Sequence, residues 1–315
     1  MNAYSAYSDP LYVHSLREFG RPRELARSGG WILERPIPGT SYTDATGCYP
    51  LFACRDWSKL PEDLAEVGRE VVSLALVVDP FSGVSPEYLQ RHFDVVKPFK
   101  THYIADLTQP PETFVGSMQR RYARKSLEKM EVEICHHPAR YAAEWVRLYD
   151  NLIRRYDIRG VSAFSPECFA NQLQVNGMML FMGKQEGQPV SASLVLKAGR
   201  KAYSHLAASS DRGYRIRAAY GVHWTILQYG REHGITHVDF GGTAGPKDDP
   251  ESGLAQFKKG WANNQRIAYF CGRVFNRQAY ELLCDQYRSV YTGYFPAYRE
   301  ALTSQRPAPA RQSPT

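Results

Sequence analysis

The sequence predicts an α/β protein of two tandem units, each with a mixed, mostly antiparallel sheet flanked by helices. The chain has 315 residues, which suits two domains of about 150 residues better than one core. Residues 71–78 are almost continuously apolar, as in a strand buried on both faces. In the second half two helical segments precede three strands, and a helix, a strand, a helix and a strand follow.

The first half shows a less complete version of this element order. A helix is expected near 86–96, and a second runs from Thr108, which could cap it, to about Met130. Arg120, Arg121, Arg124 and Lys125 share one face of that second helix. Strands are expected at 31–33, 49–54, 71–78, 102–106 and 131–135.

The second half begins after His136-His137-Pro138 with a strongly amphipathic helix. Tyr141, Trp145, Leu148 and Leu152 follow one another at spacings of four, three and four, which places them on one helix face. The remaining expected elements are a helix at 166–174, an antiparallel meander at 178–184, 190–196 and 201–209, a loop at 210–215, a helix to 233, strands at 235–240 and 267–275, and a helix at 278–301.

These segments divide the chain into four expected parts. Residues 1–137 form a degenerate N-terminal unit, and residues 138–277 form the C-terminal catalytic unit. Residues 278–303 form a helix that could pack back on the first unit. Residues 304–315, rich in Pro, Arg and Gln, are expected to be disordered.

Composition narrows the class of protein only partly. The formal net charge of +7 suits an anionic partner such as a CoA pyrophosphate, a nucleotide sugar, RNA or a phospholipid surface. The six cysteines include no CxxC pair, so neither a disulfide framework nor a metal site is predicted, and a reducing cytoplasm is expected. Residues 1–30 lack a signal-peptide pattern, and no apolar run reaches the ~18 residues of a membrane span.

Three segments carry a family resemblance. They are Asp106-Leu107 with the basic helix 120–125, the helix and strand 224–242, and the run Gly-Leu-Ala-Gln-Phe-Lys-Lys-Gly-Trp at 253–261. With the element order, they resemble the Fem-type branch of the GNAT acyltransferase superfamily, which includes peptidoglycan-bridge aminoacyltransferases. The resemblance covers most of residues 70–275. It implies an N-acyltransferase in which an amine attacks an activated carbonyl directly, without a covalent enzyme intermediate.

The resemblance implies catalytic roles for a few residues. The backbone amide of Phe257 or the ammonium of Lys258 would stabilise the oxyanion; otherwise Phe257 is a core residue and Lys258 caps a helix. Asp239 could accept the amine proton, or it could be a buried carboxylate bound by loop amides. Tyr203 and His205 alternate on the strand bordering the cleft, and each could act as acid or base unless the register turns both away.

The residues after the meander should hold the donor. In GNAT folds, amides there bind the CoA pyrophosphate. The corresponding residues here are Ser210, Arg212, Gly213, Arg215, Arg217 and Ala218. The paired glycines of the usual Arg/Gln-x-x-Gly-x-Gly/Ala pattern are missing, although arginine side chains could replace them. Acyl-CoA is the first expected co-substrate, with no permanently bound cofactor, and aminoacyl-tRNA is the alternative because Fem-type members include enzymes that use it.

The acceptor is expected to be an amine of an amino sugar, a cell-envelope precursor or a peptide-like metabolite. Asp106 could line an acceptor cleft or only shape a turn. Arg121, Arg124 and Lys125 are expected to bind substrate, including tRNA in the alternative, or else to form a solvated face. A peripheral contact with a membrane-linked precursor is compatible with the composition. The missing glycines also admit a non-catalytic binding or scaffold protein.

Overall fold

The computed structural model describes residues 6–245, 248–289 and 293–303. Within these residues, eleven strands form one sheet in the order β1-β2-β3-β4-β11-β5-β10-β9-β8-β7-β6. The strands are β1 (Arg21–Leu25), β2 (Gly30–Pro36), β3 (Thr43–Gly47), β4 (Ser73–Val77), β5 (Val95–Asp106), β6 (Glu131–Cys135), β7 (Met178–Gln185), β8 (Gln188–Ala198), β9 (Lys201–Ser209), β10 (His237–Asp239) and β11 (Asn264–Val274). The α-helices are α1 (Pro10–Ser15), α2 (Leu60–Val67), α3 (Pro86–His92), α4 (Pro111–Phe114), α5 (Ser117–Leu127), α6 (Ala142–Tyr156), α7 (Pro166–Gln172), α8 (Asp211–Ile216), α9 (Ala218–Glu232), α10 (Gly253–Lys259), α11 (Arg277–Gln286) and α12 (Ala297–Thr303).

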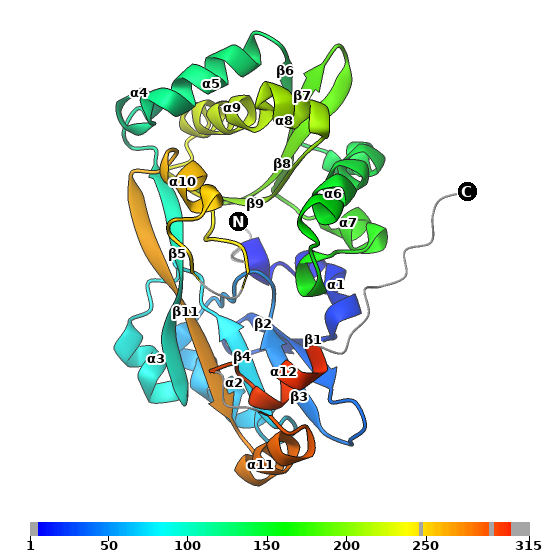
Figure 1. Cartoon of the computed structure of the whole chain (residues 1–315). Coiled ribbons are helices and arrows are strands. Elements are labelled where there is room, and N and C mark those ends of the chain that lie inside the picture. Colours follow the sequence, from blue (N-terminus) through cyan, green and yellow to red (C-terminus); the bar gives the residue numbers. More distant parts are fainter. Residues whose placement is uncertain (1–5, 246–247, 290–292, 304–315) are drawn as a thin grey trace, which may run out of the picture.

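Two long strands join the halves of the sheet. β5 and β11 pair antiparallel over most of their length, and in Figure 1 they run side by side between the upper and lower parts of the molecule. At its upper end β5 pairs with β10, and at its lower end β11 pairs with β4. The two halves therefore share a continuous backbone hydrogen-bond network.

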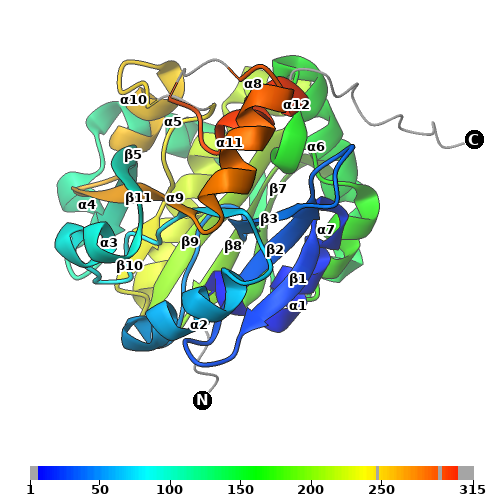
Figure 2. The same ribbon diagram turned by 90° about the horizontal axis from the view of Figure 1, so that it is seen from below.

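Helices cover both faces of the upper half. α9 lies on one face, packed with α5, through apolar residues such as Phe181, Val195 and Ile226. α6 and α7 cover the other face, where Trp145, Tyr149 and Leu194 belong to a separate core. Residues that alternate along β7 and β8 divide between these two cores, as expected of strands buried on both faces. Figures 1 and 2 show α9 and α6 on opposite sides of the strands.

In the lower half, α2 and α3 cover one face through Leu60, Leu64 and Leu89. The C-terminal helices α11 and α12 pack around Ile37 and Val72. α1 belongs to the same core as α6 and α7, so this core continues from the upper half into the lower half. Among the described residues no helix is both long and apolar enough to cross a membrane.

The predicted α/β fold class is confirmed, but some of the predicted strand positions were wrong. Residues 49–54 form no strand; only Phe52 makes a bridge, to Val78. The strand expected at 102–106 is the end of β5, which begins at Val95 because Val95 and Val96 pair with β11. The helix expected at 86–96 therefore ends at His92. Strands β1 and β3 and helices α1 and α2 were not predicted from the sequence.

Several helix predictions were also wrong. The helix expected from Thr108 to Met130 is two helices, α4 and α5, interrupted where the Gly116 amide donates to the Gly260 carbonyl. Thr108 bonds Asp106 and caps no helix. The loop expected at 210–215 is largely helix α8, and the helix expected at 278–301 is α11 and α12. The predicted tail from residue 304 lies outside the described residues.

A boundary between units at residues 137 and 138 stays a prediction. On the N-terminal side of that point, β6 pairs with β7 and α5 packs on α9. On its C-terminal side, β11 completes the sheet beside β4. The chain thus exchanges elements between the halves in both directions.

Candidate active site

The candidate site lies where β10 ends between β5 and β9. Asp239, the last residue of β10, pairs in register with Ile104 and Tyr203, so these three side chains share one face of the sheet. The chain then turns at Gly241, which has a φ of 73°, a conformation that glycine adopts without strain. The turn lets the Gly241 amide donate to Asp239 Oδ1 at 2.6 Å.

Lys258 reaches this turn from α10. Ser252 caps α10 by accepting a hydrogen bond from the Ala255 amide, and Lys258 Nζ donates to the Gly242 carbonyl at 2.6 Å. A Cβ atom on Gly241 would lie 3.3 Å from Nζ. Burial lowers the pKa of Lys258 to about 8, with Asp239 opposing the shift and Lys100 adding to it. Because burial disfavours its charged form, the Lys258 ammonium is stabilised when a nearby oxygen becomes negative. It is therefore well suited to stabilise such an oxygen in return.

Two further β5 side chains complete this cluster. His102 Nδ1 lies 2.8 Å from Asp239 Oδ2, with both side chains buried. Lys100 Nζ donates to Thr243 Oγ1 at 3.1 Å, and burial lowers the pKa of Lys100. Neither residue was predicted from the sequence. The available signal was polar residues at alternate positions of β5, which place Lys100, His102 and Ile104 on one face.

The side chains of Phe257 and Lys258 lie in different environments. The Phe257 ring packs against Tyr220 and His223, at 5.0 Å and 4.9 Å between centroids. Its backbone amide lies in the last turn of α10, where amides bond back along the helix. This geometry favours the Lys258 ammonium over the Phe257 amide as the oxyanion donor.

Tyr203 and His205 lie on the expected face of β9, but other residues cover both side chains. Tyr203 is 3% exposed and His205 is 8% exposed. The Tyr7 ring packs on Tyr203 at 5.1 Å, and its hydroxyl lies 3.4 Å from His205 Nδ1. Burial lowers the pKa of His205 to about 3, so the imidazole is neutral and only weakly basic at neutral pH.

Tyr203 is hydrogen-bonded to Asp79, a carboxylate that was not predicted as a site residue. Its hydroxyl donates to Asp79 Oδ2 at 2.7 Å, and the Phe81 amide donates to Asp79 Oδ1. Burial raises the pKa of Asp79, while these two hydrogen bonds oppose the shift. Burial also raises the pKa of Tyr203 well above its usual value. The hydrogen-bonded pair is buried, and Tyr203 is the register partner of Asp239 on the neighbouring strand.

The expected donor loop is bound mainly to its own neighbours. Ser210 caps α8 by accepting from the Gly213 amide, and it donates to the Val190 carbonyl. Arg212 bonds Gln185 at 2.6 Å and pairs with Glu186 at 2.8 Å. These contacts fasten α8 to the β7–β8 hairpin. They also occupy an amide and a cation that a pyrophosphate would need.

The other donor-loop residues are placed differently. Arg215 is exposed and Ala218 is buried at the start of α9. Arg217, between α8 and α9, has a φ of 57° and lies 3.6 Å above the Tyr122 ring. The left-handed backbone that a glycine would adopt is thus present here with a bulky side chain.

Gly213 has a packing role. A Cβ atom there would lie 2.0 Å from the Val190 carbonyl oxygen. Gly213→Ala is therefore expected to lower the free energy of unfolding by about 3 kcal/mol, measured by urea denaturation, because α8 must shift away from β8. Gly253→Ala is the matched control, since nothing lies within 4 Å of its added Cβ. Equal stability of the two variants would contradict the packing role.

The predicted acceptor residues do not form one cluster. Asp106 accepts hydrogen bonds from the Thr108 hydroxyl and amide, and its Oδ1 lies 4.0 Å from His237 Nε2. The hydrogen bond from the Thr108 hydroxyl lowers the pKa of Asp106. Arg121, Arg124 and Lys125 are instead exposed on α5. Arg120 and Arg124 line an open hollow of ≈ 510 Å³ with Leu127, Glu128 and Trp224.

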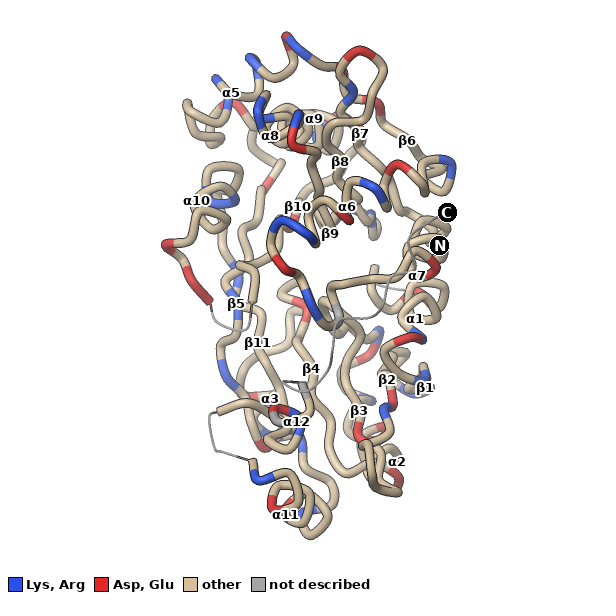
Figure 3. The backbone as a smooth tube through the Cα atoms, turned by 45° about the vertical axis from the view of Figure 1, so that its right-hand side comes forward, with Lys and Arg blue, Asp and Glu red and all other residues tan. Residues whose placement is uncertain are grey.

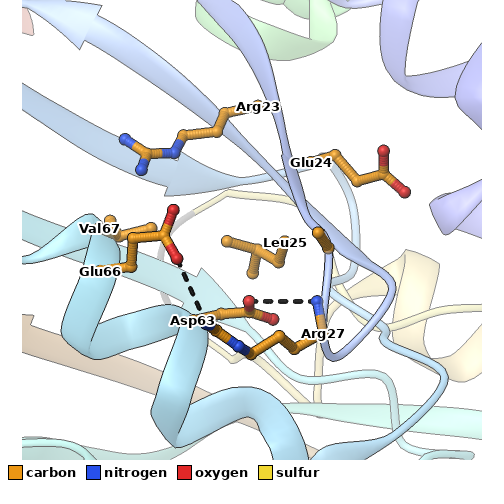
Figure 4. Close-up of a pocket in the computed structure, with 8 residues that line it drawn as sticks. Arg23, Glu24, Leu25, Arg27, Asp63, Glu66 and Val67 are labelled. Atoms are coloured by element: carbon orange, nitrogen blue, oxygen red, sulfur yellow. Dashed lines mark hydrogen bonds and ion pairs between the residues drawn. The ribbon is translucent and has the colours of Figure 1, made fainter.

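A smaller groove lies between β1 and α2, six strands from β10 in the sheet (Figure 4). Asp63 in this groove accepts hydrogen bonds from the amides of Arg27 and Ser28, and Arg27 pairs with Glu66. These polar groups hold β1 to α2. Among the described residues, no three His, Cys, Asp or Glu side chains group as a metal site requires.

Part of this chain resembles proteins of Fem type. Residues 167–283 match the model of the FemAB family. The solved structure of FemX has a TM-score of 0.64 and 16% identity, over 88% of this chain and 96% of FemX. L-PGS from Bacillus licheniformis has a TM-score of 0.56 and 14% identity, over 86% of this chain and 93% of that structure. The predicted Fem-type resemblance is confirmed, and the solved structures show that its fold extends over most of the chain.

The curated relatives include lipid II:glycine glycyltransferases from several staphylococci. The one from Staphylococcus aureus (strain USA300) is 36% identical over 102 residues, which make up 31% of this chain and 24% of the relative. The one from Staphylococcus saprophyticus is 35% identical over the same shares. The aligned segment thus spans about a quarter of the length of these relatives.

Proposed function

We propose that this protein is a Fem-type aminoacyltransferase that transfers an aminoacyl group from aminoacyl-tRNA to an amine of a peptidoglycan precursor. The observation that carries the proposal is the Lys258 ammonium, held by the Gly242 carbonyl beside Asp239. It stands in the segment that matches the FemAB family. The names of the glycyltransferase relatives support a cell-envelope acceptor.

The proposed reaction needs no covalent enzyme intermediate. The neutral amine attacks the ester carbonyl, a C–N bond forms, and the C–O bond to the ribose breaks. The proton lost by the amine is taken up by the leaving ribose oxygen. Lys258 would stabilise the carbonyl oxygen while it is negative. Burial raises the pKa of the Cys48 and Cys271 thiols to about 12, which disfavours thiolate catalysis.

Two observations favour aminoacyl-tRNA over acyl-CoA. Two groups that could bind a CoA pyrophosphate are engaged within the protein, since the Gly213 amide donates to Ser210 and Arg212 pairs with Glu186. In addition, α5 presents exposed cations, Arg120, Arg121, Arg124 and Lys125, as a phosphate-binding surface needs. An acyl-CoA donor was the first expectation from the sequence, and neither the site nor the relatives support it.

The test is a transfer assay with labelled glycyl-tRNA and with labelled acetyl-CoA, each supplied with lipid II as the amine acceptor. Label is expected to reach lipid II from glycyl-tRNA. Transfer from acetyl-CoA alone would restore the acyl-CoA donor. If neither donor gave product on lipid II or on its soluble nucleotide-linked precursor, the proposed activity would be wrong.

A further inference from the structure

Two arginine side chains stack on tyrosine rings around helix α8. Just after the helix, the Arg217 guanidinium lies 3.6 Å above the Tyr122 ring of α5. Within the helix, the Tyr214 ring lies 4.3 Å from the Arg155 guanidinium of α6. Arg217 is exposed, so its side chain is accessible to a ligand.

The backbone at Arg217 is held in a costly conformation. Its φ of 57° is a left-handed value that a non-glycine residue adopts at a cost of about 1 kcal/mol or more. The Arg217 amide donates to the carbonyls of Gly213 and Tyr214 at the end of α8, which fixes this geometry. Glycine would adopt this backbone conformation without that cost, which indicates that the Arg217 side chain provides an interaction that glycine lacks.

This stack stands between a basic surface and the candidate active site. On one side lie the α5 cations, and Figure 3 shows Lys and Arg of α5 and α8 at the same end of the molecule. On the other side, aromatic rings follow one another inward. Tyr122 packs on Tyr220 at 5.2 Å, and Tyr220 packs on Phe257 at 5.0 Å. Phe257 is the chain neighbour of Lys258.

Planar guanidinium groups stack on nucleobases, and neighbouring cations bind the phosphates. Unpaired nucleotides expose their base faces, whereas a paired stem covers them. We propose that the Arg217–Tyr122 stack binds an unpaired base at the 3′ end of the donor RNA, while the α5 cations hold its phosphates. This site rests on the proposed aminoacyl-tRNA donor. It would place the ester that joins the amino acid to the terminal ribose on the side of Phe257 and Lys258.

The test compares two RNA hairpins of identical stem, one with a single-stranded 3′ CCA end and one with a blunt end. Binding to the full chain is measured by fluorescence anisotropy at fixed salt. The wild type is expected to bind the CCA hairpin about tenfold more tightly, as one stacked base predicts. Arg217→Gly and Arg217→Lys are both expected to abolish that ratio. Glycine suits the backbone, and lysine keeps the charge without the plane.

Arg124→Ala serves as the phosphate-contact control. It should weaken binding of both hairpins equally and leave the ratio unchanged, because a cation on α5 contacts the backbone in either case. Thermal unfolding of Arg217→Gly, expected at or above the wild-type Tm, shows that a changed ratio does not reflect misfolding.

Each contrary outcome has a distinct meaning. A wild type that binds both hairpins equally, or a ratio unchanged in both Arg217 variants, would overturn the stacking site while leaving the proposed donor standing. A wild type that binds neither hairpin, even at low salt, would overturn the RNA donor as well. Displacement of the CCA hairpin by equimolar CoA would assign the stack to a free nucleotide cofactor and overturn the RNA assignment.

Discussion

Replacing Lys258 with alanine is expected to lower kcat/KM for aminoacyl transfer by about 10²- to 10³-fold. This is the usual effect of removing one donor from a preorganised oxyanion site. The matched control is Lys259→Ala, since Lys259 is the exposed neighbour on the same helix turn and should retain wild-type kcat/KM. Equal rates for the two variants would remove Lys258 from the mechanism.

The same residue predicts how activity depends on pH. Burial lowers the pKa of Lys258 to about 8, and the ammonium can donate only below that value. The kcat/KM of the wild type should therefore fall as the pH rises through about 8. The residual activity of Lys258→Ala should lack this alkaline limb. An alkaline limb that stays unchanged in Lys258→Ala would show that it reports another group.

Asp239→Asn is expected to give the second-largest loss of activity. The Asp239 carboxylate accepts hydrogen bonds from the Gly241 amide and opposes the lowering of the Lys258 pKa. Without its charge, the Lys258 pKa should fall further, by about one unit. Because fewer molecules then carry the ammonium and the turn is less firmly held, kcat/KM at pH 8 should fall about tenfold.

The shift of the alkaline limb separates this role from general damage to the fold. In Asp239→Asn the limb should move to lower pH, whereas Asp249→Asn should leave it in place. Asp249 is an exposed carboxylate of the same loop, bonded to the Glu251 amide. An unmoved limb in Asp239→Asn would show that Asp239 does not set the charge of Lys258.

The sequence predicted best what depends on neighbours along the chain. The spacing of Tyr141, Trp145 and Leu148 identified α6 because a helix repeats its face locally, and all three contribute to one core. Asp239 was found because it lies at a strand end, two residues before the glycine pair Gly241-Gly242. The run around Lys258 was found from its family resemblance. Asp239 and Lys258 both lie in one continuous segment of sequence.

What the sequence missed depends on distant contacts. His102 reaches Asp239 across 137 positions, and Tyr203 reaches Asp79 across 124, so no spacing within either segment reveals these pairs. The break between α4 and α5 depends on the carbonyl of Gly260. The left-handed backbone at Arg217 was hidden because such positions are expected to be glycine.

The position of β11 affects how the protein can fold during its synthesis. β4 and β5 are made early, yet the strand that belongs between them is Asn264–Val274. While the ribosome is still producing the intervening residues, the inner edges of both strands stay unpaired and open to wrong partners. We therefore expect the N-terminal half to reach its native sheet only after β11 has emerged from the ribosome.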